Sequence, residues 1–342
     1  MIDFRYHLVS IVAVFLALAI GLIVGATAIS PKVANQLNRA SQAEVRYQKM
    51  LYAHNSQLKD QINADNAFAQ AAARTLVRGL LQGQRVVLVV APGADSQTIG
   101  GVTSALQQSG AVVTGQVILQ PQFFDTGAVT EQALNNAAKS LAPPGVTLPG
   151  TAADPQVSGQ EAAARVISAA IVNSSGVPTM TVRQSQTVLG GFSQGYLQVS
   201  GPHGSSILAG QATMAVVVIP SVVPSYKVTG TFNLALVSFA QDLQKASRGA
   251  LLAGALTGSG AGSAIDDVAS GSAGVTLMTV DNADTPPGQI IVVQALRQLL
   301  SPHPSPTSYG IRANAVPSPA PSPLPSPSAS PSRSPTKKAG KR

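Results

Sequence analysis

The sequence predicts an α/β protein in which an N-terminal transmembrane helix and a coiled-coil-like helical stalk precede a domain with a mainly parallel sheet. Three observations predict this class. Residues 8–29 are an uncharged apolar run, residues 32–73 are polar and contain no Gly or Pro, and beyond residue 84 short Val-rich runs alternate with helical patterns. We expect the α/β domain to cover residues 84–312 and a disordered, basic, Pro/Ser-rich tail to cover residues 313–342.

The apolar run follows a short flank, residues 1–7, and is long enough to cross a bilayer. At about 1.5 Å per residue it forms a helix of about 33 Å, and the bilayer core is about 30 Å thick. A cleaved secretory signal is the alternative, because Arg5 precedes the run and Ala26-Thr27-Ala28 matches a small-x-small cleavage pattern. The run is longer than the usual signal core of about 7 to 15 residues, which favours an uncleaved signal anchor.

Both interpretations place the α/β domain outside the cytoplasm, and the anchor makes the chain a single-pass membrane protein. The basic residues within residues 32–49 weigh against this orientation under the positive-inside rule. Small residues recur every fourth position along the run, at Ala13, Ala17, Gly21 and Gly25. Gly21 and Gly25 form a GxxxG motif that allows two helix backbones to approach closely, which predicts a dimer or higher oligomer. An Ala/Gly-rich sequence also produces such a pattern by chance, so both interpretations stay open.

The polar segment 32–73 predicts a helical stalk of about 60 Å at about 1.5 Å per residue. Its heptad positions are only partly apolar, which indicates weak coiled-coil character. These positions are Leu37, Ala40, Glu44, Tyr47, Leu51, His54, Leu58, Gln61, Asp65 and Phe68.

The α/β domain begins with a β-α-β pattern. Val86–Val90 is a strand-length run, a helical pattern follows to Ser109, and Val112–Leu119 forms the next strand. Continuous Val/Ile runs are typical of strands buried on both faces, so we expect a Rossmann-like sheet with helices on each side. Further strands are expected at 214–219, 250–256 and 275–280, and further helices at 232–246 and 288–300.

Composition limits the partners. The formal net charge is +8, and the tail beyond residue 312 contributes +5, which leaves a nearly neutral remainder. This distribution argues against nucleic acid and favours contact of the tail with anionic envelope polymers or lipid head groups. The Pro/Ser repeat at 317–336 is typical of an extended polyproline II spacer, with a docking ligand for a proline-reading domain as the alternative.

The residues that carry chemistry are few and scattered. Without cysteine the chain has neither disulfides nor thiolate ligands, and no two of its histidines lie close together in the sequence. We therefore predict no enzyme activity and no resident cofactor. The four histidines are His7, His54, His203 and His303, of which His203 lies in a Gly-Pro-His-Gly turn.

Three loops allow a binding interpretation beside a structural one. Ala91–Asp95 and Gly258–Gly262 follow strands as anion-binding loops do, but neither contains a P-loop Lys, and turns in α/β domains need such residues anyway. Asp281, Asn282 and Asp284 follow the last strand as a cation site would, and they equally fit a turn before Pro286. The turn interpretation is favoured in each case.

Several segments together resemble the actinobacterial copper transport protein B (MctB-like) family between about residues 1 and 312. They are Arg5–Ser10, Ala13–Gly21, Asp65-Asn66, Gly83–Val90, Gly110–Thr114, Thr279–Asp284 and Gly288-Gln289. The resemblance implies an anchored helix, a stalk, an exported α/β domain and a role in copper homeostasis or efflux, described for the family as an envelope channel.

The metal-ligand inventory fits that role only in part. Copper prefers thiolate, thioether and imidazole ligands, and this chain has no MxxM or HxH motif among its isolated methionines. The methionines are Met1, Met50, Met180, Met214 and Met278. A single transmembrane helix cannot enclose a pore, so copper transport requires an oligomer or a partner. A bitopic, non-enzymatic scaffold for cell-envelope or cell-division partners is the second hypothesis.

Overall fold

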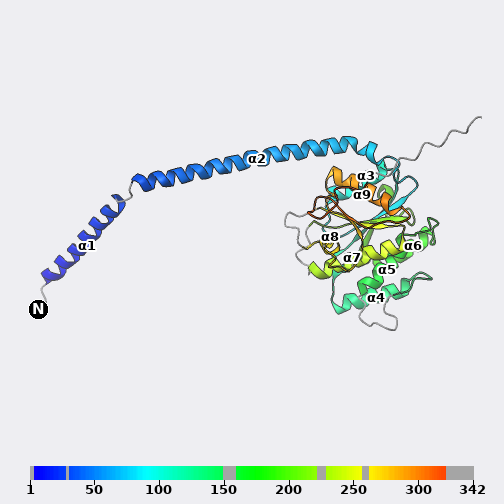
Figure 1. Ribbon diagram of the computed structural model, residues 1–342. Helices are drawn as coiled ribbons and strands as arrows, with labels where there is room; N and C mark the ends of the chain where they lie inside the picture. The colour runs from blue at the N-terminus through cyan, green and yellow to red at the C-terminus, as the bar shows by residue number, and fades with distance from the viewer. Residues whose placement is uncertain (1–3, 28–30, 149–158, 222–228, 256–261, 321–342) are drawn as a thin grey trace, which may run out of the picture. The chain divides into compact units, whose positions relative to one another are not determined.

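The computed structural model describes residues 4–27, 31–148, 159–221, 229–255 and 262–320 (Figure 1). The chain divides into two compact units, Met1–Asp65 and Asn66–Arg342. Helix α1 spans Phe4–Thr27 and helix α2 spans Pro31–Val77. Proline at the first position of α2 is favourable, because its missing N–H would have no partner in the helix.

A seven-stranded sheet forms the centre of the second unit, in the order β3-β2-β1-β4-β5-β6-β7. All neighbouring pairs are parallel except β2 and β3. The strands are β1 (Arg85–Val90), β2 (Val112–Leu119), β3 (Leu197–Ser200), β4 (Met214–Val218), β5 (Ala250–Ala253), β6 (Met278–Val280) and β7 (Ser308–Tyr309). This confirms the prediction of an α/β protein with a mostly parallel sheet and one N-terminal apolar helix.

Helices cover both faces of the sheet. They are α3 (Ser96–Gln108), α4 (Ala128–Leu141), α5 (Gly159–Ile171), α6 (Val182–Phe192), α7 (Thr229–Ala246), α8 (Ala264–Ala269) and α9 (Pro286–Leu299), with short 3-10 turns η1 (Pro121–Phe124) and η2 (Pro202–Gly204). In Figure 1, α3 and α9 lie on one side of the sheet, and α4, α5 and α7 lie on the other.

The sequence of strand β1 is continuously apolar because both faces of the strand are packed against helices. Val87 and Val89 belong to one hydrophobic cluster, with residues of α4, α5, α6 and α7. Val86, Leu88 and Val90 belong to a second cluster on the opposite face, with residues of α3 and α9. A strand buried on both faces has no polar side, so the alternation typical of half-exposed strands is absent.

The last turns of α2 belong to the second cluster. Val77 is fully buried there, and Ala69 and Ala73 pack against the cluster. After the helix, the Leu81 N–H donates to the Ser109 carbonyl at 3.2 Å, which ties this segment to the end of α3. The coiled-coil character of the stalk stays a prediction, since it concerns contacts with a second chain.

The chain after β7 folds back on the sheet. Val316 N–H donates to the Ser308 carbonyl at 2.9 Å, and Gly310 N–H donates to the Val316 carbonyl at 3.1 Å. Residues 321–342 of the Pro/Ser-rich tail lie outside the described residues.

Candidate functional site

Helix α1 is a candidate membrane span. Its segment Tyr6–Gly25 has a mean hydropathy of 2.9 and no buried residue, and it is the one described helix that is long and apolar enough. A signal sequence near an N-terminus has the same length and composition, so this finding leaves the choice between anchor and cleaved signal open.

The small-residue face of α1 is not covered by any of the residues that the structure describes. Ala13, Ala17, Gly21 and Gly25 are exposed. A Cβ atom built at Gly21 or Gly25 would meet no atom within 4 Å outside the helix. This leaves room for another helix backbone, and the dimer stays a prediction.

Helix α2 exposes large apolar side chains at the expected heptad positions. Leu37 is 71% exposed, Leu51 is 49% exposed and Leu58 is 42% exposed, with Tyr47 and Phe68 exposed beside them. Apolar side chains that recur along one helix usually pack against a partner.

Within the described part of the α/β domain, imidazole and thioether groups are not brought together by the fold. The four histidines are all exposed and lie in different parts of the chain: His7 on α1, His54 on α2, His203 in η2 and His303 in the loop after α9. Met214 and Met278 are fully buried in β4 and β6 as part of the core, whereas Met50 is exposed on α2. Within the described ranges, no three His, Cys, Asp or Glu side chains lie close enough to hold a metal ion.

His203 occupies the turn that its sequence predicts. It lies in η2 with a φ of 55°, in the left-handed region where few side chains other than those of Asn, Asp and His occur. The residue is exposed, and its conformation is that of a turn.

The acidic residues after β6 organise a turn and anchor a downstream segment. The Asp281 carboxylate is buried and accepts hydrogen bonds from the backbone N–H groups of Ile311 at 2.8 Å and Arg312 at 3.2 Å. Arg312 Nε lies 3.8 Å from the same carboxylate. The Asn282 carbonyl accepts from the hydroxyl of Thr285, the residue that caps α9. These contacts support the turn interpretation.

Asp284 is the exposed member of this group. Partial desolvation raises the pKa of its carboxyl, and the negative charges of Asp95 and Asp281 act in the same direction. A bound cation at this edge would need these carboxylates as ligands, but Asp281 is already committed to two N–H groups of its own chain.

The loop Ala91–Asp95 is a helix cap. The Asp95 carboxylate accepts from the Thr98 N–H at 2.9 Å, and this hydrogen bond is the main cause that lowers the pKa of Asp95. A carboxylate therefore occupies the position at the start of α3 where a bound anion would sit. Most of the second loop, Gly258–Gly262, lies outside the described residues.

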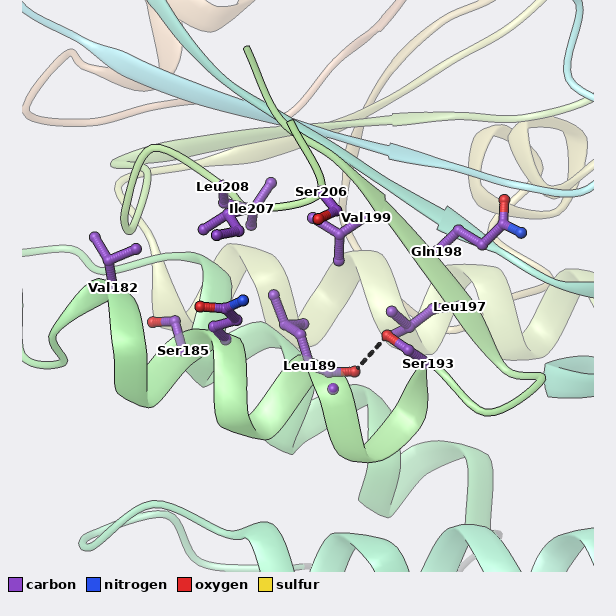
Figure 2. Close-up of a pocket in the computed structure, with 12 residues that line it drawn as sticks. Val182, Ser185, Leu189, Ser193, Leu197, Gln198, Val199, Ser206, Ile207 and Leu208 are labelled. Atoms are coloured by element: carbon purple, nitrogen blue, oxygen red, sulfur yellow. Dashed lines mark hydrogen bonds between the residues drawn. The ribbon is translucent and has the colours of Figure 1, made fainter. Parts of the chain in front are cut away.

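A pocket of about 420 Å³ lies between α6, β3 and the segment 206–208 (Figure 2). Sequence reasoning missed it, because three segments that are separated in the sequence each contribute a few ordinary side chains. The lining residues carry no charge: Val182, Ser185, Gln186, Leu189, Gly190, Ser193, Leu197, Gln198, Val199, Ser206, Ile207 and Leu208.

Comparison with known proteins places this architecture in a family. A family model described as "Copper transport outer membrane protein, MctB" matches residues 1–319. The chain is 29% identical over 304 residues to the "Copper transporter MctB" of Mycobacterium leprae (strain TN), which covers 88% of this chain and 94% of the relative. It is 27% identical over 303 residues to the protein of the same name from Mycobacterium tuberculosis (strain ATCC 25618 / H37Rv), with the same coverage. Because the matched region runs from the apolar helix through the α/β domain, the chain belongs to the MctB family of copper transport outer membrane proteins.

Proposed function

We propose that this chain is a non-enzymatic, membrane-anchored envelope protein that serves copper homeostasis or efflux. One observation carries the proposal: the match to proteins named copper transporters covers 94% of their length, from the apolar helix to the last strands. The distribution of histidines supports the non-enzymatic part, since all four are exposed and lie in different segments of the chain.

In this proposal α1 stays in the membrane as a single-pass anchor and the α/β domain lies outside the cytoplasm. The exposed apolar surface of Tyr6–Gly25 supports the anchor, because such a surface is stable in lipid. The polar helix that follows would then keep the domain away from the bilayer surface.

Transport by this chain requires more than one copy, or a partner in the envelope. One apolar helix cannot enclose a path for an ion, and each copy contributes a single candidate span within the described residues. Two uncovered surfaces could hold copies together: the small-residue face of α1, and the exposed leucines of α2 at positions 37, 51 and 58.

The stalk also carries the thioether and imidazole that are nearest to each other in the sequence. Met50 and His54 lie four residues apart on α2 and both are exposed, so they neighbour each other on one side of the helix. Two parallel stalks would together present two thioethers and two imidazoles. This is a donor set that copper accepts and that magnesium and calcium do not favour.

The test is copper handling in a strain that lacks the gene. We expect copper accumulation and sensitivity to rise, and the wild-type gene to restore both. Normal copper handling in that strain would contradict the copper role.

The stalk site is tested separately in the same strain with the double substitution Met50→Leu and His54→Ala. The double variant should restore copper handling poorly, and His203→Ala, which alters an exposed histidine in a turn, should restore it fully. Full restoration by the double variant would overturn the stalk site while leaving the copper role intact. Protein abundance is followed by immunoblot, so that a loss of copper handling is not mistaken for a loss of protein.

Oligomerisation is tested by crosslinking of Cys introduced at Gly21 or Gly25, because the chain has no cysteine of its own. A disulfide-linked dimer is expected at these positions in native membranes. Cys at Ile23, on a different side of the helix, is the matched control and should crosslink less.

A bitopic scaffold for cell-envelope or cell-division partners is the second candidate. The separation of imidazole and thioether groups in the described domain favours it, as does the length of α2 with its exposed apolar side chains. Misshapen or chained cells with normal copper handling would support the scaffold and contradict transport.

A further inference from the structure

The pocket beside β3 is formed by an edge strand and a helix. Strand β3 is the terminal strand of the described sheet, where β2 is its neighbour, and three of its residues line the pocket. Leu189 points from α6 toward Val199 of β3 and toward Leu208 (Figure 2). Leu189, Leu197 and Leu208 are nearly fully buried, and together they form an apolar floor.

The rim of the pocket is polar but uncharged. Gln186, Gln198 and Ser206 are exposed lining residues, and Ser193 already donates its hydroxyl to the Leu189 carbonyl at 2.9 Å. A volume of about 420 Å³, mostly apolar walls and a few neutral hydrogen-bonding groups are typical of sites for small organic molecules.

Ser185 is the buried polar group of this pocket. It is only 3% exposed, it lines the pocket, and its hydroxyl oxygen has no hydrogen-bond partner. A buried hydroxyl without a partner is unfavourable unless a bound molecule or water satisfies it. Ser185 thus brings a buried hydroxyl without a partner to the wall of the pocket.

Gly190 is the lining position that has no side chain of its own. Glycine destabilises a helix relative to alanine, and its neighbour Gly191 has a steric reason for lacking a side chain, because a Cβ there would lie 2.3 Å from Leu141. Gly190 has no such reason, since a Cβ at this position would meet no atom within 4 Å. A larger side chain at 190 would instead project from α6 beside the pocket that Gly190 lines.

The geometry points to a binding site for a neutral amphiphile, a molecule with an alkyl chain that fills the space over Leu189, Leu197 and Leu208 and a hydroxyl or carbonyl that pairs with Ser185. This proposal is independent of the copper role. Copper has no ligand here, because no His, Cys, Met, Asp or Glu lines the pocket. The chain's own Pro/Ser-rich tail is a poor occupant, since Pro-rich segments dock in aromatic-lined grooves and no aromatic residue lines this pocket.

The test uses the full chain in native membranes and a decyl alcohol that carries a terminal photoreactive diazirine. After illumination, labelled peptides are identified by mass spectrometry, and labelling within residues 182–208 is divided by labelling of α1, which reports probe dissolved in the lipid. The substitution Gly190→Leu should reduce this ratio at least about 10-fold, since a side chain then competes for the space of the ligand.

Gly100→Leu is the matched control. Gly100 is also an exposed helical glycine with no atom within 4 Å of a built Cβ, and it lies on α3, far along the chain from the pocket. It should leave the ratio unchanged. Both variants keep the fold, because both replace a helical glycine at a position with open space.

Two further arms test the chemistry of the site. Ser185→Ala should lower labelling about 3- to 10-fold, as the loss of one hydrogen bond predicts. The decanoate analogue of the probe should label the pocket at least about 10-fold less than the alcohol, because burying an unpaired carboxylate is unfavourable.

Equal labelling of the wild type and Gly190→Leu, or labelling confined to α1, would overturn the proposal. The proposal would also be overturned if an endogenous peptide crosslinked to residues 197–199 and decanol did not displace it. The site would then be an edge-strand docking site for a protein.

Discussion

Replacing Asp281 with Ala is expected to lower the free energy of unfolding of the α/β domain by about 2–6 kcal/mol. The carboxylate is only 2% exposed and accepts two backbone hydrogen bonds, from Ile311 at 2.8 Å and Arg312 at 3.2 Å. Alanine leaves both N–H groups without an acceptor, and each such group costs about 1–3 kcal/mol when buried. The lower end applies if the exposed side chain of Ile311 lets water reach its N–H.

For a domain of this size, 1 kcal/mol changes the melting temperature by about 2–4 °C, so the variant should melt at least about 4 °C lower. Scanning calorimetry of the full chain measures this without tryptophan fluorescence, since the chain has no Trp. A melting temperature within about 2 °C of the wild type would refute the reasoning, because water would then satisfy both N–H groups.

Arg312→Ala separates the hydrogen bonds from the ion pairs. It removes the guanidinium that contacts Asp266 and Asp281 but keeps the backbone N–H of residue 312. Each of the two partly exposed ion pairs contributes about 0–1 kcal/mol, so this variant should lose at most about 2 kcal/mol and less stability than Asp281→Ala. An equal loss of stability in the two variants would show that the ion pairs of Arg312, and not the hydrogen bonds to Asp281, stabilise this segment.

Three further predictions concern stability and assembly. Asp242→Asn should raise the melting temperature at pH 7, because desolvation raises the pKa of this carboxyl and its ionisation therefore opposes folding. The gain in melting temperature should vanish when the pH falls below 3.8, the ordinary pKa of Asp, because the wild-type carboxyl is then protonated in both the folded and the unfolded chain. A gain that persists at such a pH would contradict this explanation. Gly288→Ala should destabilise the domain by more than 1 kcal/mol in chemical denaturation, since its Cβ would lie 1.8 Å from a backbone oxygen, whereas Gly100→Ala, with open space, should stabilise it by about 0.5–1 kcal/mol. The double substitution Leu51→Asn and Leu58→Asn should convert an oligomer to monomers in sedimentation of the detergent-solubilised chain, with the melting temperature of the α/β domain unchanged; oligomers that survive would exclude the stalk as their contact.

Strands β1 and β4 could be predicted from the sequence because they are buried on both faces. Val86–Val90 is continuous because its residues pack alternately into two clusters, and the same holds for Met214–Val218. β3 was not predicted, because its four residues form a strand only by pairing with β2, far away in the sequence. β7 was also missed, since a two-residue strand carries no periodicity.

For the candidate sites, too, the sequence predicts local features but not those that depend on residues far away in the chain. The turn at His203 is local, and its Gly-Pro-His-Gly sequence already indicated it. The role of Asp281 depends on N–H groups 30 and 31 residues later, so the sequence left both a turn and a cation site open. The uncharged pocket could not be predicted from the sequence either, because Ser185, Gly190 and Leu208 line the same cavity only once the chain has folded.

The packing of the last turns of α2 sets the limits of an autonomously folding fragment. A protein cut at residue 84 would keep every strand but would lose Val77 and Leu81, and it would expose apolar surface of the second hydrophobic cluster. A cut at residue 312 would remove Val316, the partner of Ser308 and Gly310. A fragment suitable for crystallisation or spectroscopy therefore begins near Asn66 and ends beyond Val316, and a shorter one is expected to aggregate.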